Sequence, residues 1–375
     1  MKSKRFLILD FLRGYFLCVI VIDHLGRFPG VYEYFSGQAK MWVSAAEGFF
    51  FISGMMIGYV RGRKNLEKKF DYVYKKLLSR AFLLYVLAIV MTLFFTFVGY
   101  FYANSPNLKN NWEPINDTFH FVIDILTLDY SYGWTDFLRY YAVFILASPI
   151  AIYFLRKKQW YIVGISSILI WFFFRESDSY AAWQIIFFIG SIVGFYIPEI
   201  VHFYNHISRK IKVALVSSIL IISFITFVAS AFATFVLDNY AGQNIYDSFL
   251  WLRNFSALFV PRDYISFPRL IIFGFWFLSL VFILHKYFYR IPDRIKNIFL
   301  FFGQNSLIAF ILQGLVVFFS SLWIPKSESV IYNFAVVSGV FVVLYFSVKG
   351  IVWMNEKKFK SIYVEKYITT SQQIG

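Results

Sequence analysis

Long apolar runs, separated by short polar segments, follow one another along nearly the whole chain. Each run approaches the ~20 residues that a helix needs to cross the hydrocarbon core of a bilayer. The runs are continuous and do not alternate with period two, which excludes a membrane β-barrel. We therefore predict ten membrane-spanning helices, at residues 6–26, 41–60, 78–101, 136–155, 159–175, 181–198, 213–237, 268–288, 298–321 and 330–353.

The composition supports a polytopic protein of the lipid bilayer. Of the 375 residues, 59% are hydrophobic, 23% are aromatic and only 15% are charged, whereas charged residues make up about 25% of an average soluble domain. No linker or low-complexity segment divides the chain. We predict an all-α bundle of about ten transmembrane helices, which forms a single transmembrane domain over residues 1–375.

The positive charges are distributed as in a multi-pass membrane protein. The net charge is +15, but 26 of the 36 Lys and Arg residues fall in alternate segments between the predicted spans. This distribution explains the charge by topology, so nucleic acid is not an expected partner. Basic segments stay in the cytoplasm, which places both termini there. These segments are residues 1–5, 61–80, 156–158, 199–212, 286–297 and the tail from Lys349.

The first predicted span contains four ionisable residues, Asp10, Arg13, Asp23 and His24. Arg13 and His24 are eleven residues apart, so they share one helix face at depths that differ by about 16 Å. Such groups are costly within a membrane and usually face a bundle interior or a wet cavity. Asp10 can pair with Arg13, three residues further on. The alternative is an Arg that reaches the interface and a His at the lipid headgroups.

The second predicted span contributes a carboxylate and two glycines. Glu47 lies near its outer end, level with His24, and a carboxylate beside an imidazole can orient it; an interfacial charge is the alternative. Gly54 and Gly58 form a small-xxx-small pair that allows close helix approach. Gly190 and Gly194 repeat the pattern in the sixth span. We predict that these glycines serve helix packing.

Several further residues are candidates for binding. The basic loop contains Arg61, Arg63 and Arg80. Its charges either serve only to keep the loop in the cytoplasm or form an anion site for nucleotide phosphates. The outside loops 102–135 and 238–267 contain Trp112, Trp134 and Trp251. These aromatic side chains either bind a sugar or form an aromatic belt at the membrane interface. Polar residues near or within other spans suggest a bundle lined for a polar ligand; these are Asp136, Trp183, Gln184, Arg269 and Gln313.

No metal site is predicted. Cys18 is the single cysteine, which excludes a disulfide framework and a multi-cysteine metal site. His202 and His206 are four residues apart, a spacing that can hold a metal. With no further His or Cys nearby in sequence, the pair fits a solvated loop better.

The residues of the first two spans resemble a known family. LDFLRGYFLCVIVIDHLG resembles the first helix of the membrane-bound acyltransferase-3 superfamily, whose hallmark is an Arg, ten residues and a His. AEGFFFISGMMIGYVRGRK is similar to the OpgC-type branch, named for enzymes that succinylate osmoregulated periplasmic glucans. Later segments extend the resemblance over residues 5–320; these are TDFLRYYAVFILASP, AAWQIIFFIGSIVG, FPRLIIFGFWFLSL and GQNSLIAFILQGLVV.

The resemblance implies an O-acyltransferase of the bacterial inner membrane. It would move an acyl group, succinyl or acetyl, from cytoplasmic acyl-CoA to a hydroxyl of a periplasmic glucan or other extracytoplasmic polysaccharide. Acyl-CoA would be the donor substrate, with no permanently bound cofactor. The family often carries a His where Gln313 stands, so this chain could use a different acyl group or acceptor.

The resemblance also implies roles for the candidate residues. His24 would be the general base, oriented by Glu47 or Asp23, and either Ser53 or Gln184 would stabilise the oxyanion. Direct transfer and an acyl-histidine route both stay open. The donor would meet Arg13, Asp10, Arg61, Arg63 and Arg80, and the substrates would meet Asp136, Trp183, Gln184, Arg269, Gln313 and Ser53.

A transporter or flippase without transferase activity is the main alternative, because spans with central polar groups and a basic inner face fit it too. No inverted repeat is visible in the sequence, which weighs against it. A purely structural or sensory protein would not need a buried Arg and His on one helix face. The oligomeric state stays open, with a homo-oligomer among the options.

Overall fold

The computed structural model describes residues 6–37, 40–102, 118–239, 250–259 and 264–372. In these ranges all regular structure is helical, and no strand is formed. The helical part of the predicted fold class is thereby confirmed. The chain separates into two compact units. We name them unit 1, Met1–Phe35 with Asp293–Gly375, and unit 2, Ser36–Pro292.

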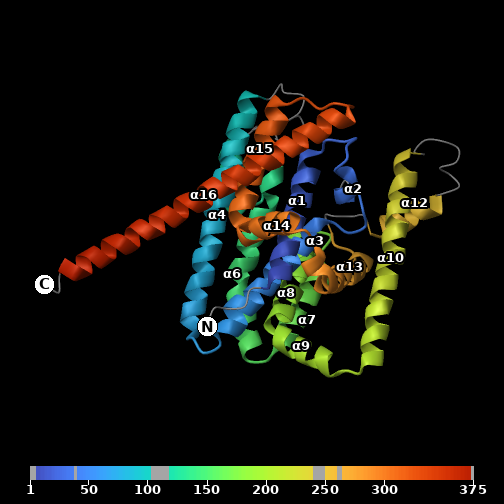
Figure 1. Ribbon diagram of the computed structural model, residues 1–375, viewed down its shortest axis with the longest axis horizontal. Coiled ribbons are helices and arrows are strands. Elements are labelled where there is room, and N and C mark those ends of the chain that lie inside the picture. Colours follow the sequence, from blue (N-terminus) through green and yellow to red (C-terminus); the bar gives the residue numbers. More distant parts are fainter. Residues whose placement is uncertain (1–5, 38–39, 103–117, 240–249, 260–263, 373–375) are drawn as a thin grey trace. The chain divides into compact units, whose positions relative to one another are not determined.

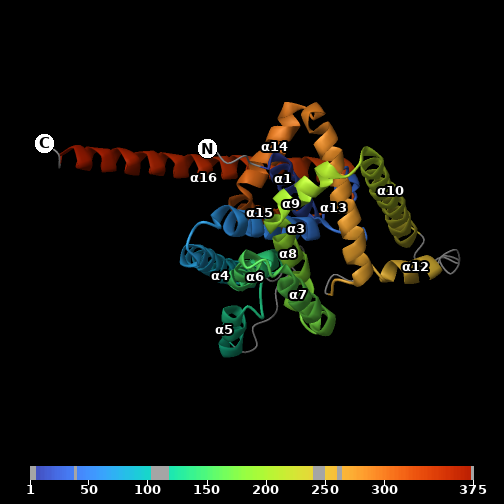
Figure 2. The same ribbon diagram turned by 90° about the horizontal axis from the view of Figure 1, so that it is seen from below.

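Unit 1 joins the beginning of the chain to its end. Its helices are α1 (Leu7–Leu25), the short α2 (Glu33–Ser36), α14 (Asp293–Gln304), α15 (Ser306–Trp323) and α16 (Val330–Gln372). α1 packs against both α14 and α15, and α15 packs against α16. The C-terminal part of α16 extends beyond the other helices of this unit (Figures 1 and 2).

The contact between α1 and α14 is a contact between backbones. A Cβ atom on Gly14 would lie 1.8 Å from the Phe299 carbonyl oxygen, and one on Gly303 would lie 1.7 Å from the Asp10 carbonyl oxygen. Both distances are far below any van der Waals separation, so only glycine fits at these two positions. The two glycines thus fix how closely α1 and α14 approach.

Unit 2 contains the remaining described helices and four short helical turns. α4 lies beside α6, and α10 lies beside α13 (Figures 1 and 2). In chain order its elements are α3 (Ala45–Met56), η2 (Ile57–Gly62), η3 (Arg63–Asn65), α4 (Phe70–Phe101), α5 (Thr118–Thr127), η4 (Gly133–Thr135), α6 (Asp136–Arg156), α7 (Trp160–Phe174), α8 (Ser179–Phe195), α9 (Ile197–His206), α10 (Arg209–Asn239), α12 (Leu250–Ala257), α13 (Phe267–Tyr287) and η5 (Phe288–Arg290).

The two predicted glycine pairs meet each other between α3 and α8. A Cβ on Gly54 would lie 1.9 Å from the Phe187 carbonyl oxygen, and one on Gly58 would lie 1.9 Å from that of Ser191. From the other side, Gly194 is equally close to the backbone of Met55, at 2.0 Å. The Ser191 hydroxyl also donates to the Gly54 carbonyl oxygen at 3.2 Å. The predicted packing role of these glycines is confirmed.

The number of membrane spans is only partly supported. Each predicted span contains a helix, but in the described part of the chain six helices are long and apolar enough to cross a membrane. The number is seven if α8 and α9, which are bent by 65°, count as one. α3 has 12 residues and α7 has 15, and α1 contains three charged residues. The count of ten and the location of the termini stay predictions.

One predicted span is wrong in its boundaries. Residues 298–321 do not form a single helix, because the chain breaks at Asn305 between α14 and α15. The Asn305 side chain donates to the Phe301 carbonyl oxygen at 2.9 Å, so it satisfies the last turn of α14 locally. Asn commonly competes with helical hydrogen bonding in this way.

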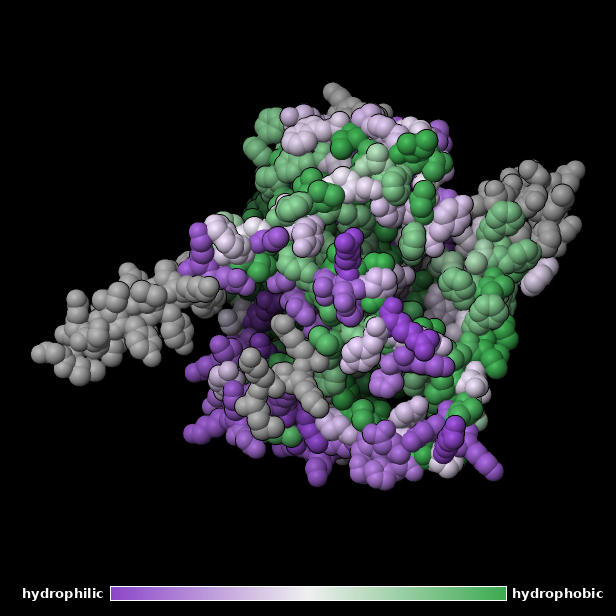
Figure 3. Space-filling model, in the orientation of Figure 1, coloured by the Kyte–Doolittle hydropathy of each residue, from purple (hydrophilic) through white to green (hydrophobic). Residues whose placement is uncertain are grey.

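Three of the predicted cytoplasmic segments meet at one end of unit 2. Arg156 donates to the carbonyl oxygens of Asn65 at 3.1 Å and of Leu66 at 2.6 Å, and Arg63 pairs with Glu199 at 2.6 Å. Hydrophilic side chains gather along this lower edge in Figure 3, whereas hydrophobic ones cover α10. Segments 61–80, 156–158 and 199–212 therefore share one side of unit 2, as the positive-inside pattern requires.

We expect Gly54→Ala to lower the free energy of unfolding by about 1–3 kcal/mol, because the added methyl group forces α3 and α8 apart. Gly274→Ala is the matched control: within the described chain its Cβ would meet nothing within 4 Å. Its better helix propensity, up to about 1 kcal/mol, should leave stability unchanged or raised. Thermal unfolding of both purified variants in detergent tests this, and equal melting temperatures would contradict it.

Candidate active site

The polar face of α1 is the first component of the site. α1 is one unbroken helix from Leu7 to Leu25, so Arg13 and His24 share a face, as predicted from their spacing. Both side chains are half-buried, and Asp10 is buried. The pairing of Asp10 with Arg13 stays a prediction. Asp23 is half-buried and lies near enough to Tyr15 to interact with it electrostatically.

His24 meets the predicted substrate-binding residue Gln313 within unit 1. The Gln313 side chain lies near the His24 ring. Neither atom of the Gln313 amide completes a hydrogen bond with any described residue. Gln313 is fully buried, at 0% exposure. The structure thus brings together a potential base and an amide whose hydrogen-bonding capacity is not used by the described chain.

A second polar group continues this face of α15. Ser320 is buried and lies seven residues after Gln313, which is the same helix face. Its hydroxyl, like Nδ1 of His24, is buried without a hydrogen-bond partner in the described ranges. Each such group costs about 1–3 kcal/mol. Three of them in one helix pair indicate a polar lining that is suited to a ligand.

The residues after α1 tie it to the end of α15. Gly26 ends α1 in a left-handed conformation, φ 54°. The Arg27 guanidinium then donates to the carbonyl oxygens of Pro325 at 2.7 Å, Ile324 at 2.5 Å and Ser320 at 3.2 Å. The Ile324 and Pro325 carbonyls follow the last turn of α15, where a cation is favoured. Burial lowers the pKa of Arg27. This bridge holds α15 against the C-terminal end of α1.

The same segment is also joined to α16. Asn333 donates to the carbonyl oxygens of Pro29 at 2.8 Å and Ser327 at 2.7 Å, and the hydroxyls of Tyr32 and Ser338 are 2.9 Å apart. Sequence reasoning did not identify Arg27 or Ser320 as candidates. Its position directly after the glycine that ends α1 is the signal that could have identified Arg27.

Glu47 and Arg269 form a buried ion pair within unit 2. Arg269 Nε donates to Glu47 Oε1 at 2.5 Å and Nη1 donates to the Phe259 carbonyl oxygen at 3.1 Å. The second Glu47 oxygen accepts from the backbone N–H of Ser44 at 3.0 Å and from the Ser44 hydroxyl. An exposed interfacial charge does not describe Glu47, whose exposure is 0%. Orientation of His24 by Glu47 stays a prediction.

Gln184, Trp183 and Ser53 are buried in the α3–α7–α8 part of unit 2. The Gln184 amide accepts from the Ser167 hydroxyl at 2.6 Å and donates to the carbonyl oxygens of Ser167 at 2.8 Å and Ala181 at 3.2 Å. These bonds join α7 to α8 and account for both amide atoms. Trp183 packs on Phe50, with 5.2 Å between ring centroids. The structure thus gives Gln184 and Trp183 packing roles, and their substrate-binding roles stay predictions.

The three predicted phosphate contacts differ in their surroundings. Arg63 is engaged by Glu199 and by the Phe195 ring, 5.8 Å from its centroid. Arg61 lies in the π-helical turn η2 and Arg80 in α4, both half-buried. The side chains of Arg61 and Arg80 form no ion pair and no hydrogen bond with the described residues. Arg61 and Arg80 are therefore the better candidates for an anion.

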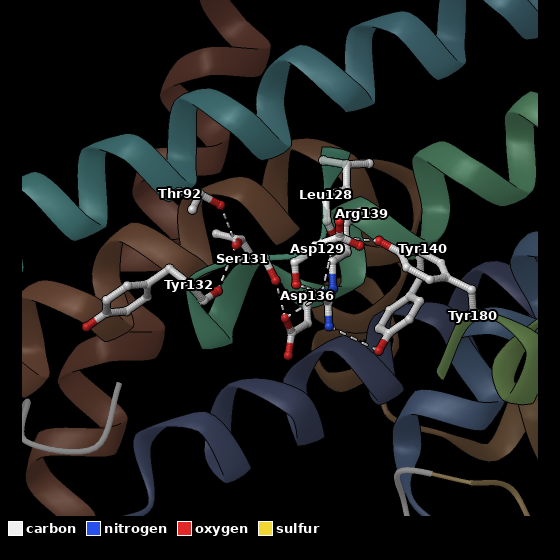
Figure 4. Close-up of polar contacts among 10 residues, drawn as sticks. Thr92, Leu128, Asp129, Ser131, Tyr132, Asp136, Arg139, Tyr140 and Tyr180 are labelled. Atoms are coloured by element: carbon white, nitrogen blue, oxygen red, sulfur yellow. Dashed lines mark hydrogen bonds and ion pairs between the residues drawn. The ribbon is translucent and has the colours of Figure 1, made fainter. Parts of the chain in front are cut away.

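Asp136 begins α6 in a polar and aromatic cluster, drawn in Figure 4. Its carboxylate accepts from the Ser131 hydroxyl and lies 3.4 Å from Arg139 Nε. Arg139 in turn lies over the rings of Tyr140 and Tyr180, at 5.0 and 5.6 Å, and donates to the Leu128 carbonyl oxygen at 3.2 Å. The cluster thus fixes the chain before α6 and leaves the Asp136 side chain 45% exposed.

The other predictions fall outside this cluster. Trp134 is buried against Phe95 and Tyr132, whereas Trp251 is exposed and Trp112 lies outside the described residues. Burial also raises the pKa of Tyr132. His202 and His206 lie on exposed α9 with ring centroids 4.0 Å apart. In the described chain no group of three or more potential metal ligands is formed.

Comparison with known families covers nearly the whole chain. The model of the family described as OpgC protein matches residues 5–356, a range that includes all of unit 2, most of unit 1 and all the site residues above. No curated protein and no solved structure matches the chain. The match extends well beyond half of the chain and agrees with the resemblance found in the first two spans. The chain therefore belongs to the OpgC protein family.

Proposed function

We propose that this protein is an O-acyltransferase of the bacterial inner membrane. It moves an acyl group, succinyl or acetyl, from cytoplasmic acyl-CoA to a hydroxyl of a periplasmic glucan or related polysaccharide. The observation that carries the proposal is the juxtaposition of His24 with the buried Gln313 amide, on the helix that also holds Arg13. Membership of the OpgC family supports the reaction class.

His24 acts as the general base of the transfer. It removes the proton of the attacking hydroxyl as the oxygen bonds to the thioester carbonyl carbon. The tetrahedral intermediate then collapses, the carbon–sulfur bond breaks, and the CoA thiolate takes up the proton that His24 holds. In the acyl-histidine route the imidazole first attacks the same carbonyl and then passes the acyl group to the hydroxyl. Both routes require His24 to meet the thioester.

Cations serve the donor. Arg61 and Arg80 face the CoA phosphates at the basic end of unit 2, where their charges are not used by other described side chains. Arg13 attracts the polar pantetheine arm along α1. Arg63 is less suited to this role because Glu199 already neutralises it. Asp136, half exposed at the start of α6, offers a carboxylate for the hydroxyls of the carbohydrate acceptor.

We expect His24→Ala to abolish acyl transfer, a loss of at least about 10²-fold, because the hydroxyl then has no base. The assay is purified protein in liposomes with labelled acyl-CoA and extracted envelope glycans. His202→Ala, an exposed histidine on α9, is the matched control and should keep full activity. Normal acyl incorporation by His24→Ala would remove His24 from the mechanism. Solute movement without CoA release would favour a transporter instead.

We expect Arg13→Ala to weaken use of the donor, with a rise in KM for acyl-CoA of about tenfold, the effect of losing ~1.4 kcal/mol of binding. Steady-state kinetics with varied acyl-CoA measures this. Arg209→Ala, an exposed arginine at the start of α10, controls for a general loss of positive charge. An unchanged KM for acyl-CoA would count against a contact between Arg13 and the donor.

A further inference from the structure

We propose that the Gln313 side-chain amide donates a hydrogen bond to the carbonyl oxygen of the acyl thioester and stabilises the oxyanion that forms there. This inference rests on the proposed acyl transfer and assigns its electrostatic component to one residue. Gln313 then differs in role from the oxyanion candidates suggested by the sequence, Ser53 and Gln184.

The first argument is the unused capacity of the amide. Gln313 is fully buried, yet neither its nitrogen nor its oxygen completes a hydrogen bond with the described chain. A buried amide in this condition destabilises a protein by about 1–3 kcal/mol. A leucine of similar size would not have this cost, so the amide is best explained by a partner that arrives with the substrate.

A comparison within the same chain strengthens this argument. Gln184 is also buried in a helix, but its amide is fully engaged by Ser167 and Ala181. The fold therefore can satisfy a buried glutamine when the role is structural. Gln313 and the neighbouring Ser320 hydroxyl are not satisfied in this way by any described residue. The difference indicates that the face of α15 with Gln313 is prepared for a ligand.

The second argument is position. An oxyanion donor and a general base must both reach the reacting carbonyl, each at about 3 Å from its target atom. Gln313 lies beside the His24 ring, so one carbonyl group can meet both. The Arg27 bridge to Ser320, Ile324 and Pro325 restrains α15 near the outer end of α1. The donor is thus held in place before the reaction, as electrostatic stabilisation requires.

The chemistry of the Gln313 amide indicates which group of the acyl donor it contacts. Its N–H group is neutral and donates to any carbonyl oxygen, and it gains strength as that oxygen becomes negative. A distal carboxylate of a succinyl group would be better matched by an arginine. Gln313 therefore acts on the carbonyl common to all acyl thioesters and does not select between acyl groups.

We expect Gln313→Leu to lower kcat by about 10²–10³-fold, the usual effect of removing one oxyanion donor. KM for acyl-CoA should change little, and the loss should be the same with acetyl-CoA and succinyl-CoA. The melting temperature should be equal to that of the wild type or higher, because an unsatisfied polar group has been removed. A loss confined to succinyl-CoA would overturn the proposal, since the amide would then read the distal carboxylate.

Two variants control this experiment. Gln304→Leu makes the same chemical change at an exposed position at the end of α14 and should leave kcat unchanged. Gln313→His retains an N–H donor and should keep more activity than Gln313→Leu. If Gln313→Leu keeps the wild-type kcat, this inference fails while the proposed function stands. If the wild-type protein transfers no acyl group, the proposed function itself fails.

A spectroscopic test avoids turnover. In a His24→Ala background the donor can bind without reacting, and infrared difference spectra with carbonyl-labelled acyl-CoA report the thioester C=O stretch. A hydrogen bond from Gln313 polarises the carbonyl and lowers its frequency. We expect the band to return to higher frequency in the double variant His24→Ala, Gln313→Leu. Identical bands in the single and double variants would overturn the assignment, even if both proteins fold normally.

Discussion

A polar group that is buried away from water must find a partner within the chain or in a ligand, and this constraint organises the molecule. Unit 2 meets it internally at Glu47 and Gln184: both oxygens of Glu47 are occupied, and the Gln184 amide joins α7 to α8. In unit 1, by contrast, His24 Nδ1, the Gln313 amide and the Ser320 hydroxyl are buried without a hydrogen-bond partner among the described residues. Stability and chemistry are thus assigned to different sets of buried polar groups.

Close backbone packing determines which face of α1 remains for chemistry. Asp10 and Gly14 lie four residues apart, so they occupy the same face, and there the α14 backbone at Phe299 and Gly303 approaches α1 directly. No side chain fits between the two helices at Gly14 and Gly303, and the ring of Phe299 packs on those of Phe11 and Tyr15 beside this contact. Arg13 and His24 lie beside this face, about 60° and about 40° from Asp10 around the helix, and the His24 end of α1 is held to α15 through Arg27. One short helix is therefore a packing element and, in the proposed mechanism, also carries the catalytic base.

The sequence predicted features that depend on periodicity within one helix. The shared face of Arg13 and His24 needs only an unbroken α1, and the Gly54 and Gly190 contacts need only the four-residue spacing of small residues. The break at Asn305 was missed because the C-terminal part of α14, residues 298–302, and the whole of α15 are apolar. Hydropathy alone therefore predicted one continuous helix. The Gly14–Gly303 contact was missed because it joins residues nearly 300 positions apart, each a single glycine without a pattern of its own.

Partner choice among buried groups was the least predictable feature. Glu47 was considered either as an orienting group for His24 or as an interfacial charge. Its ion pair with Arg269, 222 residues away in the chain, and its bonds to Ser44 could not be predicted from the sequence. Gln184 and Gln313 look alike in sequence, since each is one amide within an apolar run. They differ only in whether a neighbouring helix presents a partner, as Ser167 does for Gln184. Tertiary packing decides that, and it therefore decides which glutamine is available to a substrate.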